Sequence, residues 1–350
     1  YVPEPAATNV LTYSQDLSQS AWSNADTTDT QLAGTAPDGT NTANKLLEAA
    51  TTATHFIGHN YAAWVSGTTY TLSVFAKAAE LRYLQLSLSM LSFPDTGRRA
   101  IFDLQGGTVT ASETGVTALI RNVGNGWYRC SISAVADVTD GGICNFLLAR
   151  DPTGYNQSYA GDASKGLLLW GIQVETGARA TSYIATTGST ASRAADVLRV
   201  PLANIPGFSA AGYTLFADLR MDYVATGGTA RAITVSDGDS SDRSAVGFAA
   251  PAQKISLLTF SGGVSQHNVE FSTWNTSRRK IGYSVAANSY LTAIDGAAQT
   301  PDTSGIMPVG LSRLDIGSAY GTADYLNGFI FRAGLIPQAL TQAQINGMTA

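Results

Sequence analysis

The sequence predicts an all-β protein that consists of two antiparallel jelly-roll β-sandwiches in tandem and one short C-terminal helix. Apolar residues alternate with polar ones over short runs, and Gly, Asn, Asp and Pro separate these runs. Helical periodicity is nearly absent. Because an antiparallel sheet buries only one face, such runs are typical of sandwiches and jelly rolls. At roughly 150 residues per domain, a chain of 350 residues is expected to form two domains.

The first half of the chain carries the clearest strand patterns. Residues 70–77 (YTLSVFAK) and 83–90 (YLQLSLSM) alternate with a period of two, and the leucines of the second run share one face. Turn signals separate the runs, among them Pro37-Asp38-Gly39, Gly124-Asn125-Gly126 and Asp140-Gly141-Gly142. Residues 1–195 are therefore predicted to form the first β-sandwich domain.

A segment of small polar residues divides the chain. Residues 180–195 (ATSYIATTGSTASRAA) lack periodicity and are predicted to link the two domains. The alternation then resumes in seven runs, at residues 213–221, 230–235, 245–248, 254–260, 269–271, 279–286 and 327–335. Residues 196–350 are therefore predicted to form a second sandwich.

The C-terminal end departs from the strand pattern. Thr341 and Gln344 form a T-x-x-Q capping box, in which the Thr side chain binds the third backbone amide and the Gln side chain reaches back. Pro337 stands just upstream of this cap. Together they predict one short helix at this end of the chain.

Composition excludes several classes of partner. Charged residues make up 13% of the chain, about half of the ~25% usual in soluble proteins, and the formal net charge is −5. Since a nucleic-acid groove needs a basic face, we expect no nucleic-acid partner. Hydrophobic residues reach 44%, which excludes a disordered chain. No apolar run approaches the ~20 residues that span a bilayer, so we expect no membrane insertion.

The chain opens on Tyr1 rather than on Met, and we expect it to be processed or to be part of a longer protein.

The two cysteines, Cys130 and Cys144, flank a predicted hairpin that turns at Asp140-Gly141. In such a hairpin the thiols lie about six or seven residue pairs apart, on the order of 20 Å at ~3.3 Å per residue. A disulfide requires Cα atoms within about 7 Å of each other. Both cysteines are therefore predicted to be reduced and buried.

Catalytic patterns are scarce in this sequence. Glycoside hydrolysis needs two carboxylates at one sugar bond, and the few glutamates form no alternating acidic strand. No nucleophile elbow or phosphate loop is present. His55 and His59 share one face of a predicted strand, but two imidazoles are too few for a zinc centre. The sequence predicts a protein without enzymatic activity, and a carboxylate pair assembled in space is the alternative.

Three aspartates, Asp237, Asp239 and Asp242, cluster around an Asp-Gly pair. Oxygen ligands of this kind suit Ca²⁺, which accepts about six to eight of them. Asp-Gly is also the usual two-residue hairpin loop, and no acidic residue closes the cluster in the manner of an EF-hand. The favoured interpretation is a polar turn, a structural Ca²⁺ ion is the alternative, and no other cofactor is expected.

Aromatic side chains are the best candidates for ligand binding, because a sugar stacks its C–H face on a flat ring while amide and acidic groups bind its hydroxyls. Two sets of residues fit this chemistry: Tyr155, Asn156, Gln157 and Tyr159 in one loop, and Tyr320, Asp324 and Tyr325 in another. Burial in a core is the alternative for both sets. Trp127 and Trp170 stand in apolar strands and are predicted to be core residues.

An ordered series of short motifs covers residues 8–197. It comprises NVLTYSQD at 9–16, AW at 21–22, APDGT at 36–40, ANKL at 43–46, SGTTY at 66–70, GNGWYRC at 124–130, LWGIQVE at 169–175, TSYI at 181–184 and RAAD at 193–196. In this order the motifs resemble a carbohydrate-binding-module-like β-sandwich of phage, prophage or gene-transfer-agent-like tail-fibre and head-fibre proteins.

The second half carries RLDIG at 313–317, LNG at 326–328 and LIPQALT at 335–341. These motifs resemble the concanavalin-like or laminin-G-like jelly roll that often follows the first module in such fibres. The family offers no shared catalytic motif that maps onto this chain.

The resemblance implies a structural and adhesive component of a phage or phage-like particle, such as a tail fibre, head fibre or spike, that binds host-surface glycans without catalysis. Its implied location is the virion surface, outside the host cell. Its implied partners are host cell-surface polysaccharide and other virion proteins, and its implied assembly is a homotrimer, in which linked weak sites gain about 10²–10⁴ in effective affinity. A purely architectural decoration module of the capsid or tail and a capsular-polysaccharide depolymerase are the alternatives.

Overall fold

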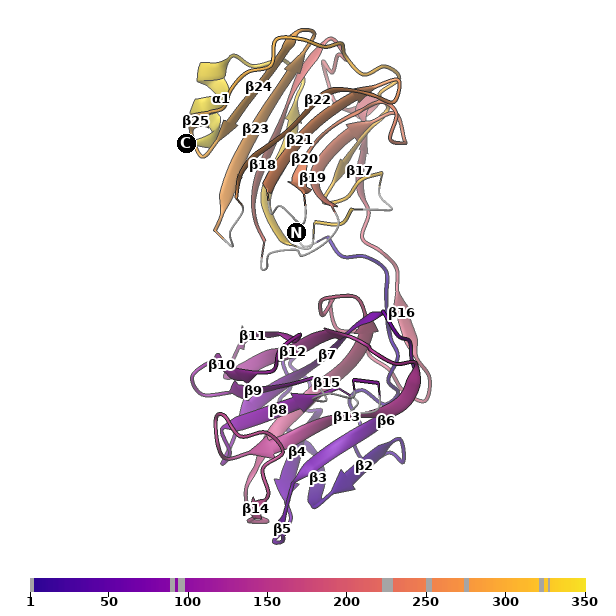
Figure 1. The fold of residues 1–350 in the computed structure, drawn as a ribbon, viewed down its shortest axis with the longest axis vertical. Helices are drawn as coiled ribbons and strands as arrows, with labels where there is room; N and C mark the ends of the chain where they lie inside the picture. The colour runs from indigo at the N-terminus through magenta and orange to yellow at the C-terminus, as the bar shows by residue number, and fades with distance from the viewer. Residues whose placement is uncertain are drawn as a thin grey trace. The chain divides into compact units, whose positions relative to one another are not determined.

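The computed structural model describes residues 3–88, 92–93, 98–221, 229–249, 254–273, 277–320, 324–326 and 328–350. These residues form two antiparallel jelly-roll β-sandwiches that follow one another along the chain, and one α-helix at the C-terminal end (Figure 1). The predicted all-β fold class is therefore confirmed. Residues 89–90 of the predicted strand 83–90 and residue 327 of the predicted run 327–335 lie outside the described residues.

The first sandwich spans Ala7–Arg193 and has two six-stranded sheets. Sheet I contains, in spatial order, β10 (Thr108–Ser112), β9 (Arg99–Asp103), β8 (Tyr83–Ser87), β13 (Asp140–Ala149), β6 (Phe56–Trp64) and β2 (Trp22–Ala25). Sheet II contains β11 (Thr117–Gly124), β12 (Trp127–Val135), β7 (Thr69–Ala78), β15 (Gly166–Thr176), β4 (Ala43–Glu48) and β3 (Thr27–Gly34). Two short pairs complete it, β1 (Ala7–Asn9) with β16 (Ala191–Arg193) and β5 (Thr52–Ala53) with β14 (Tyr159–Ala160).

The core of the first sandwich lies between these two sheets. Leu72 and Val74 of β7 point into it from sheet II, and Phe146 and Leu148 of β13 point into it from sheet I. All four side chains are buried. The period of two in the sequence therefore identifies the inward faces of these strands, because successive side chains of a strand point to opposite sides.

The two predicted core tryptophans are buried, but they lie outside this inter-sheet core. Trp127 and Trp170 join Phe75 in a separate cluster on the outer face of sheet II. Their indole nitrogens donate to the carbonyl of Thr35 (3.1 Å) and to the hydroxyl of Thr42 (2.9 Å) in the segment that covers the cluster. The prediction of burial is confirmed, and the structure adds that the buried face is the outer one.

The predicted hairpin between the cysteines is wrong. Cys130 lies on β12 in sheet II and Cys144 on β13 in sheet I, so the chain crosses from one sheet to the other between them. Both thiols are free and buried, as predicted, but sheet membership rather than hairpin register keeps them apart. Burial raises the pKa of both thiols, that of Cys144 to about 12.

The segment 180–195, predicted as a linker, belongs to the first sandwich as far as Arg193. Ile184 is buried, and its amide donates to the side chain of Gln173 (2.8 Å). Thr181 is also buried and donates from its amide (2.5 Å) and its hydroxyl (2.9 Å) to the carboxylate of Glu175. The segment lacks an apolar periodicity because its small polar residues cover the polar side chains of Gln173 and Glu175 in sheet II.

The division of the chain into compact units runs between residues 6 and 7 and between residues 193 and 194. The predicted domains were 1–195 and 196–350, which assigns the first residues to the first domain. In the structure residues 3–6 group with the second unit, and within it Glu4 and Asp196 exchange two hydrogen bonds of 2.9 and 3.0 Å.

The second sandwich also has two sheets. Sheet III contains β17 (Leu198–Pro201), β26 (Arg313–Ile316), β19 (Thr229–Ser236), β20 (Arg243–Ala249), β21 (Lys254–Ser261) and β22 (Val264–Thr273). Sheet IV contains β25 (Ala297–Ala298), β24 (Ser289–Ile294), β23 (Arg279–Ala286), β18 (Gly212–Met221) and β27 (Gly328–Ile336). A 3₁₀ turn follows β17 at Leu202–Asn204. The seven predicted runs fall on β18 to β23 and on β27, while β17, β24, β25 and β26 were not predicted.

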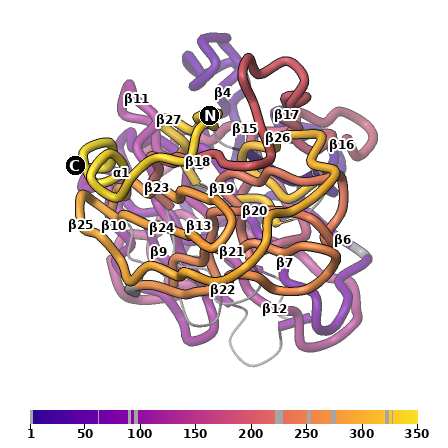
Figure 2. The backbone as a smooth tube through the Cα atoms, turned by 90° about the horizontal axis from the view of Figure 1, so that it is seen from above, coloured from indigo at the N-terminus to yellow at the C-terminus, as the bar shows by residue number. Residues whose placement is uncertain are grey.

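The predicted C-terminal helix is α1 (Gln342–Thr349), and both hydrogen bonds of the predicted capping box at Thr341 are present. The helix lies against β23, β24 and β25 (Figure 2). Gly282 of β23 allows this approach, since a Cβ there would lie 3.2 Å from Thr349 Cγ2 and 3.5 Å from Ile345 Cβ. No helix in the described residues is long and apolar enough to span a membrane.

Candidate functional site

The loop after β13 holds one predicted site, and its Gln157 side chain is used by the loop itself. Its amide oxygen accepts from the backbone amides of Arg150 (2.9 Å) and Asp151 (2.8 Å). Its amide nitrogen donates to the carbonyls of Asp151 (2.7 Å) and Gly154 (2.5 Å). An amide side chain has two donor and two acceptor positions, and all four are filled. Gln157 therefore braces the loop.

The neighbouring Asn156 and Tyr159 are engaged in the same way. Asn156 exchanges two hydrogen bonds with the side chain of Gln85 on β8, both 2.8 Å. The Tyr159 hydroxyl donates to the carbonyl of Leu148 (3.2 Å), and its ring lies 4.7 Å from the guanidinium carbon of Arg150. Burial, aided by a hydrogen bond to Glu48, raises the pKa of Tyr159. These side chains close the loop onto sheet I.

Tyr155 is the fourth member of this set. It is half-buried, and its ring lies 4.9 Å from the guanidinium carbon of Arg99, whose Nε donates to Glu113 (2.8 Å). The structure thus brings all four predicted residues into one loop. It directs the polar groups of Gln157 and Tyr159 into the protein, while Asn156 is exposed and its Oδ1 accepts from Gln85. This loop, residues 150–162, is called the closed loop below.

The aspartate cluster at 237–242 folds as a polar turn. Asp242 is buried, and its carboxylate accepts from the backbone amides of Val309 (2.8 Å) and Gly262 (3.1 Å). Asp237 and Asp239 both accept from the hydroxyl of Ser241, at 3.0 and 2.7 Å. No group of three or more His, Cys, Asp or Glu side chains suited to a metal occurs among the described residues, which include this whole cluster. These contacts are those of a polar turn, and a bound calcium ion stays the alternative.

The two histidines of the predicted strand point to different partners. His55 Nδ1 lies 2.6 Å from the carbonyl of Asp26, and His59 Nε2 lies 3.2 Å from the hydroxyl of Thr12. Burial lowers the pKa of His59. Both imidazoles are buried and help to hold the first sandwich together.

The second predicted set leads to the outer face of sheet III. Strand register places Asp315 of β26 opposite Arg199 of β17 on one side and opposite Thr234 of β19 on the other. Their chain neighbours Leu314 and Val235 belong to the core between the sheets. Arg199, Asp315 and Thr234 therefore form a row on the opposite, outer face.

A second row runs beside the first. Ser236 follows Thr234 by two residues on β19, and it lies opposite both Arg313 of β26 and Arg243 of β20. Arg231 reaches the same face at a bulge of β19, opposite Gly247. We call the outer-face residues the arginine face: Arg199, Arg231, Thr234, Ser236, Arg243, Arg313 and Asp315.

Unmet hydrogen-bonding capacity is concentrated on the arginine face. Twelve buried side-chain nitrogen and oxygen atoms have no hydrogen-bond partner within the described residues, and five of them lie on this face: Arg231 Nη1, Thr234 Oγ1, Ser236 Oγ, Arg313 Nε and Asp315 Oδ2. The last two atoms approach to 3.4 Å without hydrogen-bond geometry. Since buried polar groups in native proteins are nearly always bonded, such a concentration needs an explanation such as ordered water or a ligand.

Two predicted residues border the arginine face. The Tyr320 carbonyl accepts from Arg199 Nη2, and the Asp324 carbonyl accepts from the backbone amide of Arg231 (2.8 Å). The Asp324 carboxylate also lies 3.8 Å from Arg231 Nε. Burial raises the pKa of Tyr320, while the guanidinium groups of Arg243 and Arg231 act in the opposite direction.

Tyr325, the third member of the predicted set, pairs through its backbone with Arg231. Burial and the nearby Asp196 carboxylate raise the pKa of its hydroxyl. Tyr325 thus supports the strand that carries Arg231 through its backbone.

The local sequence does not single out the four arginines of the face. Arg199 and Arg313 stand in short strands that were not predicted. Arg231 stands in the predicted run 230–235 without any local motif, and Arg243 lies two residues before the predicted run 245–248. The only local signal is the alternation Arg313-x-Asp315, which places two charges on one strand face.

No protein-family model and no curated protein sequence matches the chain. Among solved structures, sheep galectin-11 in complex with glycerol is 9% identical over 40% of this chain and 98% of that chain, with a TM-score of 0.28. The LG4-5 domains of the mouse laminin alpha1 chain are 9% identical over 81% of this chain and 88% of that chain, with a TM-score of 0.30. TM-scores of this size carry no weight for fold or function, so both are argued from the chain itself.

Proposed function

We propose that this protein is a non-catalytic glycan-binding adhesive protein and that the arginine face is its binding site. The observation that carries the proposal is the group of five buried polar atoms on one sheet face that have no hydrogen bond within the described residues. They include guanidinium donors, a carboxylate acceptor, and hydroxyls that both donate and accept. A saccharide presents donors and acceptors on every ring carbon that bears a hydroxyl, so it can complete such a mixed set.

Partly exposed groups give a saccharide a rim to contact. The side chains of Arg199 and Asp324 are 34% and 33% exposed, while Asp315 behind them is fully buried. Tyr320 supplies a half-buried aromatic ring at the same border. The arrangement of a polar buried floor, a polar rim and one ring is typical of sites that orient a small polar ligand.

The engagement of the glutamates supports a function without catalysis. A retaining or inverting glycosidase needs one carboxylic acid and one carboxylate free to reach the sugar. Most glutamates of the chain are held by a partner: Glu48 by Arg150, Glu80 by Lys45, Glu113 by Arg99 and Glu175 by Thr181. A depolymerase would have to use other carboxylates.

The particle context of this proposal rests on the sequence motifs alone. We propose a component of a phage-like tail fibre, head fibre or spike, exposed on the virion surface and assembled as a homotrimer with other virion proteins. This context is tested by deleting the coding region from the genome of the particle and measuring adsorption of the resulting particles to host cells. Unchanged adsorption contradicts the adhesive role and favours the architectural alternative, and release of reducing ends from host capsule favours the depolymerase.

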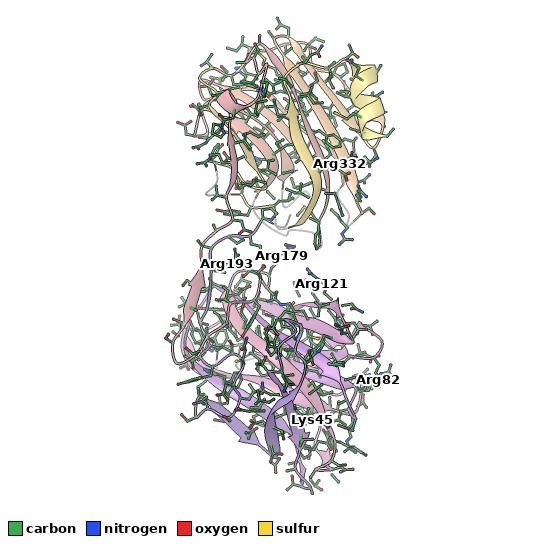
Figure 3. The ribbon with its side chains drawn as sticks, turned by 180° about the vertical axis from the view of Figure 1, so that it is seen from behind. Lys45, Arg82, Arg121, Arg179, Arg193 and Arg332 are labelled. Atoms are coloured by element: carbon green, nitrogen blue, oxygen red, sulfur yellow. The ribbon has the colours of Figure 1, made fainter. Side chains whose placement is uncertain are left out.

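The binding proposal is tested by titrating the 350-residue chain against a panel of neutral and acidic polysaccharides. The site variant is Arg231→Lys, which keeps the charge but removes the planar fork of donors. The matched control is Arg332→Lys on β27 of sheet IV. The Arg332 side chain, which is 66% exposed, is marked in Figure 3. We expect binding that Arg231→Lys abolishes and Arg332→Lys preserves. Absence of binding to every member of the panel overturns the proposal.

A further inference from the structure

Most of the unmet hydrogen-bonding capacity of the arginine face belongs to four neighbouring side chains. Thr234 of β19 lies opposite Asp315 of β26, and Ser236 of β19 lies opposite Arg313. Within the described residues, each of the four has one buried side-chain atom that makes no hydrogen bond: Thr234 Oγ1, Ser236 Oγ, Arg313 Nε and Asp315 Oδ2. We call these four residues the polar quartet. Side chains in such positions lie about 5–7 Å apart, so one ligand ring can contact several of them.

Asp315 is the acidic member of the polar quartet, and only one of its oxygens is bonded. The side chain is fully buried, and Oδ1 accepts from Arg199 Nε (2.8 Å). Oδ2 lies 3.4 Å from Arg313 Nε without hydrogen-bond geometry. A buried carboxylate oxygen that lacks a donor costs more free energy than a neutral acceptor in the same position. The partner that Oδ2 lacks is therefore a hydrogen-bond donor.

The two arginines that flank this carboxylate form its border with solvent. The side chains of Arg199 and Arg313 are 34% and 21% exposed. Arg313 Nη2 donates to the carbonyl of Gly238, so Arg313 is held by the turn at 237–242 rather than by Asp315. A ligand hydroxyl that enters along these two side chains therefore breaks no existing hydrogen bond of Asp315 Oδ2.

Asp218 on the outer face of sheet IV provides the contrast. It is also fully buried and also lies between two arginines, Arg278 and Arg332. Arg278 donates to both of its oxygens, and each of these bonds is 2.6 Å long. The protein itself thus satisfies both oxygens of Asp218, whereas it satisfies one oxygen of Asp315.

The charges around the polar quartet balance without a charged ligand. Four guanidinium groups of the arginine face stand beside five carboxylates of the face, its border and the adjoining turn. The cations are Arg199, Arg231, Arg243 and Arg313, and the anions are Asp237, Asp239, Asp242, Asp315 and Asp324. An acidic ligand group brings only acceptors to an oxygen that needs a donor, and like charges side by side are costly. A saccharide hydroxyl donates to Oδ2 and also accepts from the neighbouring Arg313, Thr234 or Ser236.

We propose, building on the proposed glycan-binding function, that the arginine face selects neutral saccharides and that Asp315 determines this selectivity. Its Oδ2 accepts a hydrogen bond from a saccharide hydroxyl, and its charge excludes carboxylate and sulfate groups from the polar quartet. Thr234 and Ser236 supply the hydroxyls that complete the hydrogen bonding of the same ligand.

The test compares neutral polysaccharides with their acidic counterparts at low and high salt. The methyl ester of polygalacturonate is paired with polygalacturonate, and dextran is paired with dextran sulfate. We expect the neutral member of at least one pair to bind at least about tenfold more tightly, the effect of one hydrogen bond to a charged group. This preference should persist at high salt, because salt screens only weakly the charge of a buried carboxylate.

The assignment to Asp315 is tested with Asp315→Asn and its matched control Asp218→Asn. Asp315→Asn removes the charge and should lower the preference for the neutral member by at least about tenfold. Asp218→Asn removes a buried carboxylate that also lies between two arginines and should leave the preference unchanged. Thermal unfolding verifies that both variants are folded.

A second pair of variants tests the polar quartet without changing its charge. Thr234→Val should weaken binding of the neutral polysaccharide, whereas Thr234→Ser, which retains the hydroxyl, should preserve it. This comparison remains decisive if Asp315→Asn fails to fold.

Four outcomes contradict specific claims. Equal binding of neutral and acidic members overturns the neutral selectivity but leaves glycan binding in place. A preference that disappears at high salt, or that both Asp variants lower equally, shows diffuse repulsion by a chain of net charge −5 and overturns the role of Asp315. Unchanged binding in both Asp315→Asn and Thr234→Val shows that the polar quartet holds only ordered water and overturns the site. No binding to any polysaccharide overturns the proposed function itself.

Discussion

The closed loop of the first sandwich and the arginine face of the second are both rich in Tyr and polar residues, yet their hydrogen bonding differs. In the closed loop, Gln157 satisfies four backbone groups and Asn156 pairs with Gln85. On the arginine face, buried atoms of Arg231, Thr234 and Ser236 have no partner among the described residues. Similar composition therefore produces a braced scaffold in one place and an incomplete polar surface in the other.

The buried polar groups of the two regions contribute to folding stability with opposite signs. A buried polar group without a partner costs about 1–3 kcal/mol, whereas a bonded one contributes about 1 kcal/mol. A fold keeps several unpartnered atoms together only where water or a ligand completes them, and this is the usual reason for strained or incomplete sites. The following changes test whether the closed loop is structural and the arginine face functional.

The largest effect is expected from Arg150→Gln at the base of the closed loop. Glu48 is fully buried and receives two bonds from Arg150, 2.5 and 3.2 Å long. Removing the cation leaves a buried carboxylate without its charge partner, which should destabilise the first sandwich by about 3 kcal/mol. Urea unfolding followed by tryptophan fluorescence measures this change. A loss below 1 kcal/mol, on the order of a surface ion pair, would show that the loop is not held as described.

A smaller loss is expected from Gln157→Ala. This substitution removes the four hydrogen bonds that brace the loop, and it should lower the stability of the first sandwich by about 1–2 kcal/mol. Affinity for polysaccharide should stay unchanged, because Gln157 faces the protein. Weakened binding in a variant that unfolds normally would move the candidate site to the closed loop.

The opposite sign is expected on the arginine face. Thr234→Val replaces an unpartnered buried hydroxyl with a methyl group of similar size. It should stabilise the second sandwich by about 1 kcal/mol, or raise its melting temperature by about 3 °C, while weakening glycan binding. Calorimetry and titration on the same sample measure both. If stability falls instead, Thr234 has a partner and the contrast between the two regions fails.

The closed loop should also respond to pH. Burial acts to raise the pKa of Glu48, but hydrogen bonds from Arg150 and from the amide of Asp162 outweigh it and lower the pKa below 4.5. A carboxyl with a depressed pKa stabilises the fold above its unfolded pKa, and this stability disappears as the pH falls through the folded pKa. The difference between wild type and Arg150→Gln should therefore shrink in unfolding curves measured below pH 4.5. A constant difference down to pH 2.5 would exclude Glu48 as the cause.

The smallest effect is expected from calcium. The turn at 237–242 resembles the closed loop, since its carboxylates already accept from Ser241 and from backbone amides. Adding calcium or a chelator should leave the melting temperature of the second sandwich unchanged. A rise on adding calcium, lost in Asp239→Asn, would restore the metal alternative.

Local patterns were sufficient wherever neighbours in the chain are also neighbours in space. The alternation at 70–77 identifies β7, and Thr341 with Gln344 identifies the start of α1. Local polarity gives a wrong prediction at 180–195, where Thr181 and Ile184 are buried against sheet II. A short polar segment carries no sign of whether it faces water or a polar sheet.

The sequence by itself determined the β-sandwich class, the inward faces of the long strands, the burial of both cysteines and the C-terminal helix. Only the tertiary structure decided that Cys130 and Cys144 lie in different sheets and that Arg199, Arg231, Arg243 and Arg313 share one face. The physical reason is that antiparallel pairing joins strands far apart in the chain, here β17 with β26, and the register of each pair sets which side chains meet. Composition can indicate that a polar residue is a candidate for binding. Its hydrogen-bond partners, however, come from strands that are distant in the sequence.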